Sequence, residues 1–446
     1  MEDSLMVAAS RSQPWSAVWD DHAYGFFVPW AIVEVSTWFP LALAPPLLVG
    51  LTVVTWWCCA LWIRQALHRS STSGIGADLA PLALCAVPLP EIGYLGLVSS
   101  AGWPLAAAAL ATVAVAGELP RGPRAWVTPA LIALVAASHP TGVVIAAVCL
   151  LRAISDRSRV RSHLARAAGA ILGVFLSMAV AHVQDPPLAY LGPWNPVGAA
   201  DEEVAERLAA GGALTTRGLG RLDPRALVEQ IGGSVRFVAT QFLPEPWASR
   251  ALIATSQSAK LLQVAALVGA PVAFGVLHAW CLRRDGKTPS PSLLLVGAAV
   301  TAVIVQHVLV GRLTARQYLF LPLVLIWTSV LVTVTHVRSG RRASRATVVL
   351  LVAWFMWVVA QNFRDPFQEN PRQGGTGRYA AVDLWRPALD RGRATCATRD
   401  ADDVVVISQV NRDDPSVQRL MQTSGLGFAW FDHPVVLRCD VLGSDS

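Results

Sequence analysis

The chain has 446 residues, of which 54% are hydrophobic and only 15% are charged. Soluble domains carry about 25% charged residues, whereas apolar runs of roughly 20 residues, long enough to cross a bilayer, recur along this chain. We therefore expect a polytopic membrane protein. The net charge of +6 does not indicate a nucleic-acid partner, because the arginines lie in short loops between apolar segments.

The chain starts with a polar stretch, residues 1–20, that lacks the basic start and apolar core of a cleaved signal peptide, so we expect no leader. Adjacent acids, Asp20 and Asp21, follow, with His22 directly after them. The next segment, 26–39, places Trp, Phe and Val beside a few polar residues, a pattern typical of a helix that lies in the membrane interface.

About ten apolar segments are then predicted to cross the membrane. The second is weak because three prolines interrupt it, and the fourth and fifth are short and meet at Ser138-His139-Pro140. The segments are 41–63, 78–89, 103–116, 126–137, 141–151, 167–183, 259–282, 293–310, 318–337 and 346–362.

Lysine and arginine concentrate in loops that share one side if the segments alternate, and that side is predicted to be cytoplasmic. The densest of these loops, 152–166, holds five arginines. The opposite side then receives the N-terminal acids, the break at His139, a polar section at 184–257 and the C-terminal tail. Within the polar section we predict a surface helix at 201–210 and an interfacial stretch at 228–247.

The tail, 364–446, contains two short β-branched runs, 404–407 and 435–437, which predict buried strands. Cys396 precedes the first run and Cys439 follows the second. Outside the cytoplasm these cysteines are expected to form a disulfide; the alternative is two free thiols. The predicted fold is an all-α polytopic transmembrane helix bundle with a small extracytoplasmic α/β appendage. Its divisions are 1–40, 41–183, 184–257, 258–363 and 364–446.

The acid pair is the first candidate for chemistry. Near a bilayer, Asp20 or Asp21 could act as a general base on an acceptor hydroxyl. The same carboxylates could hold a divalent cation beside a lipid phosphate, although the sequence identifies no metal site or cofactor. The alternative is a solvated N-terminal loop without a function.

Arg312, Arg316 and Tyr318 form a second candidate group on the predicted outer side. An arginine there could bind a phosphate in a forked geometry, or it could only extend from the span end to water. His139 could line a cavity at the break between two half-spans, but Pro140 beside it also fits an ordinary turn. The run 400–402 has the Asp-X-Asp pattern of soluble nucleotide-sugar transferases, and we interpret it as structural.

These stretches together resemble a known family. They are DDHAYGFFVPWAIVEVSTWFP (20–40), SHPTGVVIAAVCLLR (138–152), RQYLFLPLVLI (316–326) and PVVLRCDVL (434–442). In this order they resemble the GT-C superfamily of integral membrane glycosyltransferases, and more closely a group of uncharacterised actinobacterial membrane proteins of that shape. Members of the superfamily carry a span before the acidic loop, whereas nothing apolar precedes Trp15 here.

The resemblance implies a plasma-membrane enzyme that takes its sugar from a polyprenyl-phosphate donor on the extracytoplasmic side. Asp20 or Asp21 would be the catalytic base. Arg316 would bind the donor phosphate, with His22, Arg312 and Tyr318 as further substrate-binding residues. Membrane lipid is the other expected partner.

Two other functions remain open from the residues alone. One is a non-enzymatic membrane component of lipid or polymer export or assembly. The other is a small-solute transporter, which the absence of visible internal repeats disfavours. The polar pair at depth, Gln306 and His307, is the main exception to otherwise apolar spans.

Overall fold

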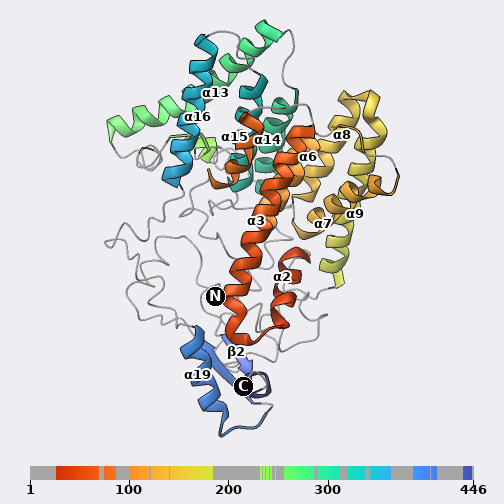
Figure 1. Ribbon diagram of the computed structural model, residues 1–446, viewed down its shortest axis with the longest axis vertical. Helices are drawn as coiled ribbons and strands as arrows, with labels where there is room; N and C mark the ends of the chain where they lie inside the picture. Colours follow the sequence, from red (N-terminus) through yellow and green to blue (C-terminus); the bar gives the residue numbers. More distant parts are fainter. Residues whose placement is uncertain are drawn as a thin grey trace.

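The computed structural model describes the helical bundle and part of the C-terminal tail. The described residues are 27–69, 75–86, 101–115, 117–119, 122–139, 141–183, 256–285, 290–310, 319–336, 342–362, 385–401, 403–408 and 435–443, with single positions between 232 and 247. This part of the chain is mostly helical, which agrees with the predicted all-α bundle. A small module that contains the strands lies at one end of the bundle, beyond α2 and the start of α3 (Figure 1).

The N-terminal half of the bundle follows the predicted order of helices. Its elements are α2 (Phe27–Thr37), η2 (Leu41–Leu43), α3 (Ala44–Arg69), α4 (Ile75–Leu79), η3 (Ala80–Cys85), α6 (Gly102–Val115), η5 (Pro123–Trp126), α7 (Val127–Ser138), α8 (Gly142–Ser155), η6 (Arg157–Arg159) and α9 (Val160–Val183). The weak segment at 78–89 forms no long helix in its described part. Proline lacks the N–H that would continue a helix, and there the chain forms only α4 and the short 3-10 helix η3.

The C-terminal half of the bundle contains α13 (Gln257–Asp285), α14 (Ser290–Val310), α15 (Phe320–His336) and α16 (Arg342–Asn362). Helices α14 and α15 are joined by buried hydroxyls, since Ser292 Oγ lies 2.6 Å from Ser329 Oγ and 2.7 Å from Thr333 Oγ1. Hydroxyl groups that bond across two helices let apolar helices bury polar atoms without leaving them unsatisfied. The part of 228–247 that is described packs on this half, because Trp354 Nε1 donates to the Phe242 carbonyl.

Helix α6 is the centre of the bundle. Every residue from Ala106 to Val115 is buried, and α6 contacts α3, α8, α14 and α15. Alanine favours helix formation, and four alanines stand in succession at 106–109. Their small side chains keep α6 narrow. Four neighbouring helices can therefore approach its backbone from different sides.

Helices α7 and α9 approach each other closely at two glycines. A Cβ on Gly169 would collide with the Pro129 carbonyl, and a Cβ on Gly173 would collide with the Ala133 carbonyl. The two glycines are four residues apart in an apolar helix, which is the spacing that membrane helices use to bring backbones into contact. The missing side chains therefore set the distance between α7 and α9.

The C-terminal module consists of α19 (Trp385–Cys396), β1 (Val404–Ser408), β2 (Val435–Arg438) and α21 (Cys439–Gly443). The strands are antiparallel and pair Val405 with Leu437. Both side chains are buried in a cluster, here called the end cluster, that joins the module to the bundle. Its members are Trp30, Ile32, Val33, Leu41, Ala44, Leu48, Ala101, Ala388, Leu389, Val405, Leu437, Cys439 and Leu442.

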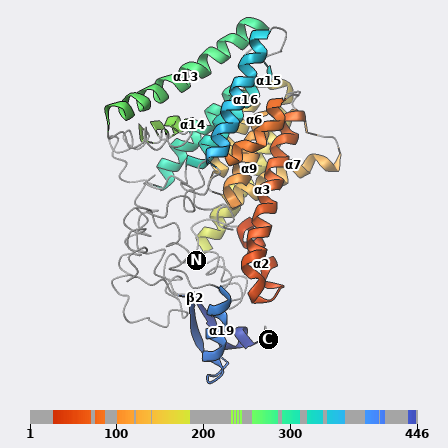
Figure 2. The ribbon, with the colours of Figure 1, turned by 60° about the vertical axis from the view of Figure 1, so that its left-hand side comes forward.

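Several helices carry large apolar side chains on their outer surface. The exposed fraction is 65% for Trp57 of α3, 65% for Phe175 of α9 and 63% for Val276 of α13. Figure 2 shows α13 along the outer side of the bundle. Among the described residues, the segment Leu41–Arg69 is the one helix long and apolar enough to cross a membrane, and several shorter apolar helices are also found there. The total of ten spans stays a prediction.

Candidate functional site

The helix that follows the acid pair is fixed in place from its first turn. The first N–H groups of a helix have no partner within it, and Val28 N–H donates to Ser138 Oγ at 3.2 Å. Ser138 in turn donates its hydroxyl hydrogen to the Leu134 carbonyl at 2.7 Å. One face of α2 is held by Trp30 and Val33, which are buried. The start of α2 is therefore attached to the break between α7 and α8.

His139 forms this break. Its backbone is extended, with φ −151° and ψ 136°, as expected for the residue before a proline. Its Nδ1 accepts the Thr141 N–H at 3.3 Å and lies 2.8 Å from Thr141 Oγ1. Because Nδ1 is an acceptor, the neutral ring carries its hydrogen on Nε2.

The imidazole of His139 is buried against the start of α6. The Trp103 ring meets it edge to face, with 4.4 Å between centroids. A Cβ on Gly102 would lie 2.8 Å from His139 Cδ2, so the absence of a side chain at 102 makes room for the ring. The break is thus a packed polar turn in which the α7–α8 connection, α6 and α2 converge.

The residues predicted to do chemistry at this end lie outside the described part of the chain. They are Asp20, Asp21, His22, Arg312, Arg316 and Tyr318. The described chain resumes at Leu319 and Phe320, which are buried. Phe320 packs edge to face on Trp56 of α3, with 5.5 Å between ring centroids. The start of α15 is therefore packed against α3.

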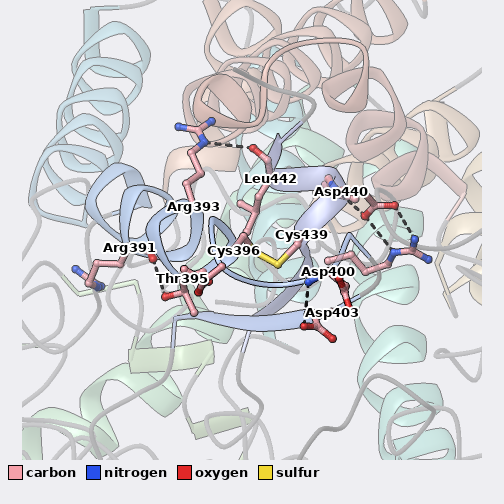
Figure 3. Close-up of a disulfide and its surroundings, with 12 residues drawn as sticks. Arg391, Arg393, Thr395, Cys396, Asp400, Asp403, Cys439, Asp440 and Leu442 are labelled. Atoms are coloured by element: carbon pink, nitrogen blue, oxygen red, sulfur yellow. Dashed lines mark hydrogen bonds and ion pairs between the residues drawn. A yellow bond between two sulfur atoms is a disulfide. The ribbon is translucent and has the colours of Figure 1, made fainter.

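Cys396 and Cys439 form a disulfide, as expected from their positions around the two strands (Figure 3). The bond joins the end of α19 to the start of α21, with 5.3 Å between the Cα atoms. Nearby, Arg393 Nε donates to the Leu442 carbonyl at 3.4 Å, so side-chain and covalent links hold the same two helices together.

The predicted Asp-X-Asp run has a local structural role in its described part. Asp400 N–H donates to Asp403 Oδ2 at 3.3 Å, and Asp403 N–H donates to the Asp400 carbonyl at 3.0 Å. These bonds close a turn before β1. The described residues contain no group of three or more metal-binding side chains.

A second polar cluster lies at the other end of the bundle, in a stretch that the sequence predicts to be a basic loop. Helices α8 and α9 extend into the predicted loop 152–166, so that only Asp156 and the short η6 separate them. The Asp156 Oδ2 atom lies 3.8 Å from Arg152, 3.7 Å from Arg159 and 3.7 Å from His163. We call this group, with Arg166 and Gly117, the α8–α9 corner.

Arg166 ties the corner to the end of α6. Its Nη2 donates to the Gly117 carbonyl at 2.7 Å, and its Nη1 lies 3.4 Å from His163 Nδ1. Ser162 Oγ adds a link by accepting Leu119 N–H at 3.1 Å. These contacts join the first turns of α9 to the chain that follows α6.

The charges in the corner change the proton affinities of its groups. The pKa of the Asp156 carboxyl is lowered, mainly by a hydrogen bond from Ser158 and less by the positive charges of Arg159 and Arg152. Burial and the adjacent Arg152 and Arg166 lower the pKa of the His163 imidazole. Asp156 is therefore ionised and His163 neutral near pH 7.

The two polar regions lie at opposite ends of α6. Ala101, just before α6, belongs to the end cluster, whereas Gly117, just after it, accepts from Arg166. The helix between them has 14 residues and so is about 21 Å long.

No protein-family model, curated protein or solved structure matches this chain.

Proposed function

We propose that the chain is an integral membrane protein that crosses the bilayer several times. The outward-facing Trp57, Phe175 and Val276 support this, because soluble proteins rarely expose large contiguous apolar surfaces. The segment Leu41–Arg69 also supports it, since only 28% of its most apolar stretch is buried within the protein. The close approach of α7 and α9 at Gly169 and Gly173 is a further feature of packed membrane helices.

The proposed orientation places the α8–α9 corner on the cytoplasmic side and the module with its disulfide outside. Arginine at the corner fits the positive-inside tendency. A disulfide between Cys396 and Cys439 is stable in an oxidising compartment. The break at His139 and the start of α2 then belong to the extracytoplasmic end.

Within this frame, the proposed activity is transfer of a sugar from a polyprenyl-phosphate donor to an extracytoplasmic acceptor. Asp20 or Asp21 removes the proton from the acceptor hydroxyl, and Arg316 binds the donor phosphate. His22, Arg312 and Tyr318 contact substrate beside them. A general base must reach the proton that it removes, so the acids need a fixed anchor.

The observation that carries the proposal is the anchoring of α2. The bond from Val28 to Ser138 and the burial of Trp30 fix the helix at the end of the bundle. Asp21 precedes Phe27 by six residues, a length of chain that reaches about 20 Å at most. The chain length thus limits how far the acid pair can lie from the start of α2.

The test uses membranes that contain the full chain, supplied with radiolabelled polyprenyl-phosphate sugars. Replacing both acids, Asp20→Asn with Asp21→Asn, should lower transfer by about 100-fold or more, the usual contribution of a general base. The matched control is Asp390→Asn, which makes the same chemical change at an exposed acid of the module. Control and double variant should insert in equal amounts.

Two results would contradict the proposal. Transfer that is unchanged in the double variant shows that the acids are not the base. A wild-type chain that transfers none of the supplied sugars favours a non-enzymatic export or assembly component.

A further inference from the structure

The α8–α9 corner brings several cationic side chains close together. Arg152 and Arg159 lie near the carboxylate of Asp156, whereas Arg166 contacts His163 and the Gly117 carbonyl. His163 stands between them and is neutral near pH 7. Arg166 is only 3% exposed. Buried charges are costly unless an opposite charge or hydrogen bonds compensate them.

The carboxylate of Asp156 does not complete this compensation. Its Oδ1 accepts the Ser158 hydroxyl at 2.6 Å, and its Oδ2 lies 3.7 Å from both Arg159 and His163. These separations exceed the N–H···O distances of about 2.7–3.2 Å that hydrogen bonds take. The carboxylate therefore lies too far from Arg159 and His163 for a hydrogen bond to either.

Two buried donors of the corner have no hydrogen-bond partner in the described part of the chain. They are Arg166 Nε and His163 Nε2, and the latter side chain is fully buried. Nε of arginine always carries a hydrogen. Since Nδ1 of His163 faces the Arg166 guanidinium at 3.4 Å, it acts as the acceptor, and Nε2 carries the hydrogen of the neutral ring. Both atoms thus offer a hydrogen to a missing acceptor.

The corner is also open to approach from outside. The Arg159 side chain is 44% exposed and Asp156 is 21% exposed. At Gly117 only the Arg159 guanidinium comes within 4.0 Å of the position of a Cβ. An absent side chain at 117 therefore leaves the Arg159 head group accessible beside the carbonyl that binds Arg166.

We infer that the α8–α9 corner is a binding site for a phosphate group. Phosphate supplies several acceptor oxygens and negative charge at one point, which matches the guanidinium groups of Arg159 and Arg166 that both lie at Gly117. The phosphate belongs either to the head group of an anionic lipid or to a soluble phosphate ester. This site lies at the opposite end of α6 from the proposed glycosyl-transfer site and does not depend on that activity.

The experiment measures thermal unfolding of the full chain in lipid nanodiscs. Inorganic diphosphate is titrated into phosphatidylcholine discs, and in a second arm phosphatidylglycerol replaces part of the phosphatidylcholine. Either anion should raise the unfolding midpoint of the wild type. A rise with diphosphate identifies a soluble phosphate, and a rise only with phosphatidylglycerol identifies a lipid head group; both support the site.

Arg159→Gln should weaken the effective anion by about tenfold or more, because a charge-assisted hydrogen bond is removed. Arg161→Gln is the matched control, since it removes the same charge from an exposed position two residues further along, in the first turn of α9. It should change the affinity by less than about twofold at physiological salt. Arg166→Gln removes the buried Nε donor. Gly117→Leu blocks access of the anion to Arg159 without changing the charge. Both variants should abolish the rise in the unfolding midpoint.

Two outcomes overturn the inference. One is a wild-type midpoint that neither diphosphate nor phosphatidylglycerol raises. The other is a loss in Arg161→Gln equal to that in Arg159→Gln, which would mean that the anion responds only to overall charge. Arg159 is half exposed, so its replacement leaves the fold intact even if Arg166→Gln does not fold.

Discussion

Replacing Gly173 by alanine should destabilise the protein, although the same change elsewhere should stabilise it. Alanine in place of glycine inside a helix gains about 1 kcal/mol when space is available. At Gly173 the new Cβ would collide with the Ala133 carbonyl and lie 2.8 Å from Ala136 Cβ. A backbone carbonyl cannot rotate away as a side chain can, so α7 and α9 must separate.

The expected change in stability is the sum of the gain in helix propensity and the cost of the steric collision. Inserting an extra group into a packed contact costs about 1–3 kcal/mol. Gly269→Ala is the matched control, because in the described part of the chain no atom lies within 4 Å of the Cβ position at 269 in α13. The control should gain about 1 kcal/mol, so the two variants should differ in unfolding free energy by about 1–3 kcal/mol.

The assay is equilibrium unfolding in mixed detergent micelles, followed by tryptophan fluorescence. Gly173→Ala should unfold at lower denaturant than the wild type or close to it, and Gly269→Ala at higher denaturant. Equal stabilisation of both variants would refute the reasoning, because it would mean that α7 and α9 do not meet at backbone distance. Gly297→Ala in α14, another open position, repeats the control in a different helix.

Two further predictions concern the module and the corner. Cys396→Ser should lower the stability of the module, because the disulfide closes a loop with a sequence separation of 43. Closing such a loop is worth about 4 kcal/mol in chain entropy. Protease should therefore cleave the tail of the variant faster than that of the wild type at the same pH. Asp156→Asn should lower the thermal midpoint at pH 7. Because the pKa of Asp156 is lowered in the folded state, its contribution is present above the usual carboxyl pKa of about 4. It is lost as the pH falls further, so wild type and variant should converge in a pH series.

The helices of the bundle were largely predictable, whereas two of their ends were not. Apolar runs of span length appear directly in the sequence, and Pro140 marks the break at His139. The predicted loop 152–166 is mostly helical instead, because arginine favours helix almost as well as alanine and charge alone does not end one. The positions of the helix ends depend on contacts such as Asp156 with Ser158.

The candidate sites show the same limit. The disulfide could be expected, since two cysteines flank two β-branched runs in one polar tail. The contact between Arg166 and Gly117 could not, because it spans 49 residues and depends on how α6 and α9 are placed in space. Gly169 and Gly173 do carry a signal in the sequence, which is their four-residue spacing in an apolar segment.

The end cluster has a consequence for how the chain is made. It combines Trp30 and Leu41, near the beginning, with Leu437 and Leu442, near the end. A ribosome makes Leu437 and Leu442 long after α2, so the end cluster cannot be complete until both have been synthesised. Contacts between distant parts of a sequence form slowly, and the module should therefore join the bundle late in folding. This step should also depend on oxidation of Cys396 and Cys439, because their bridge holds the module together.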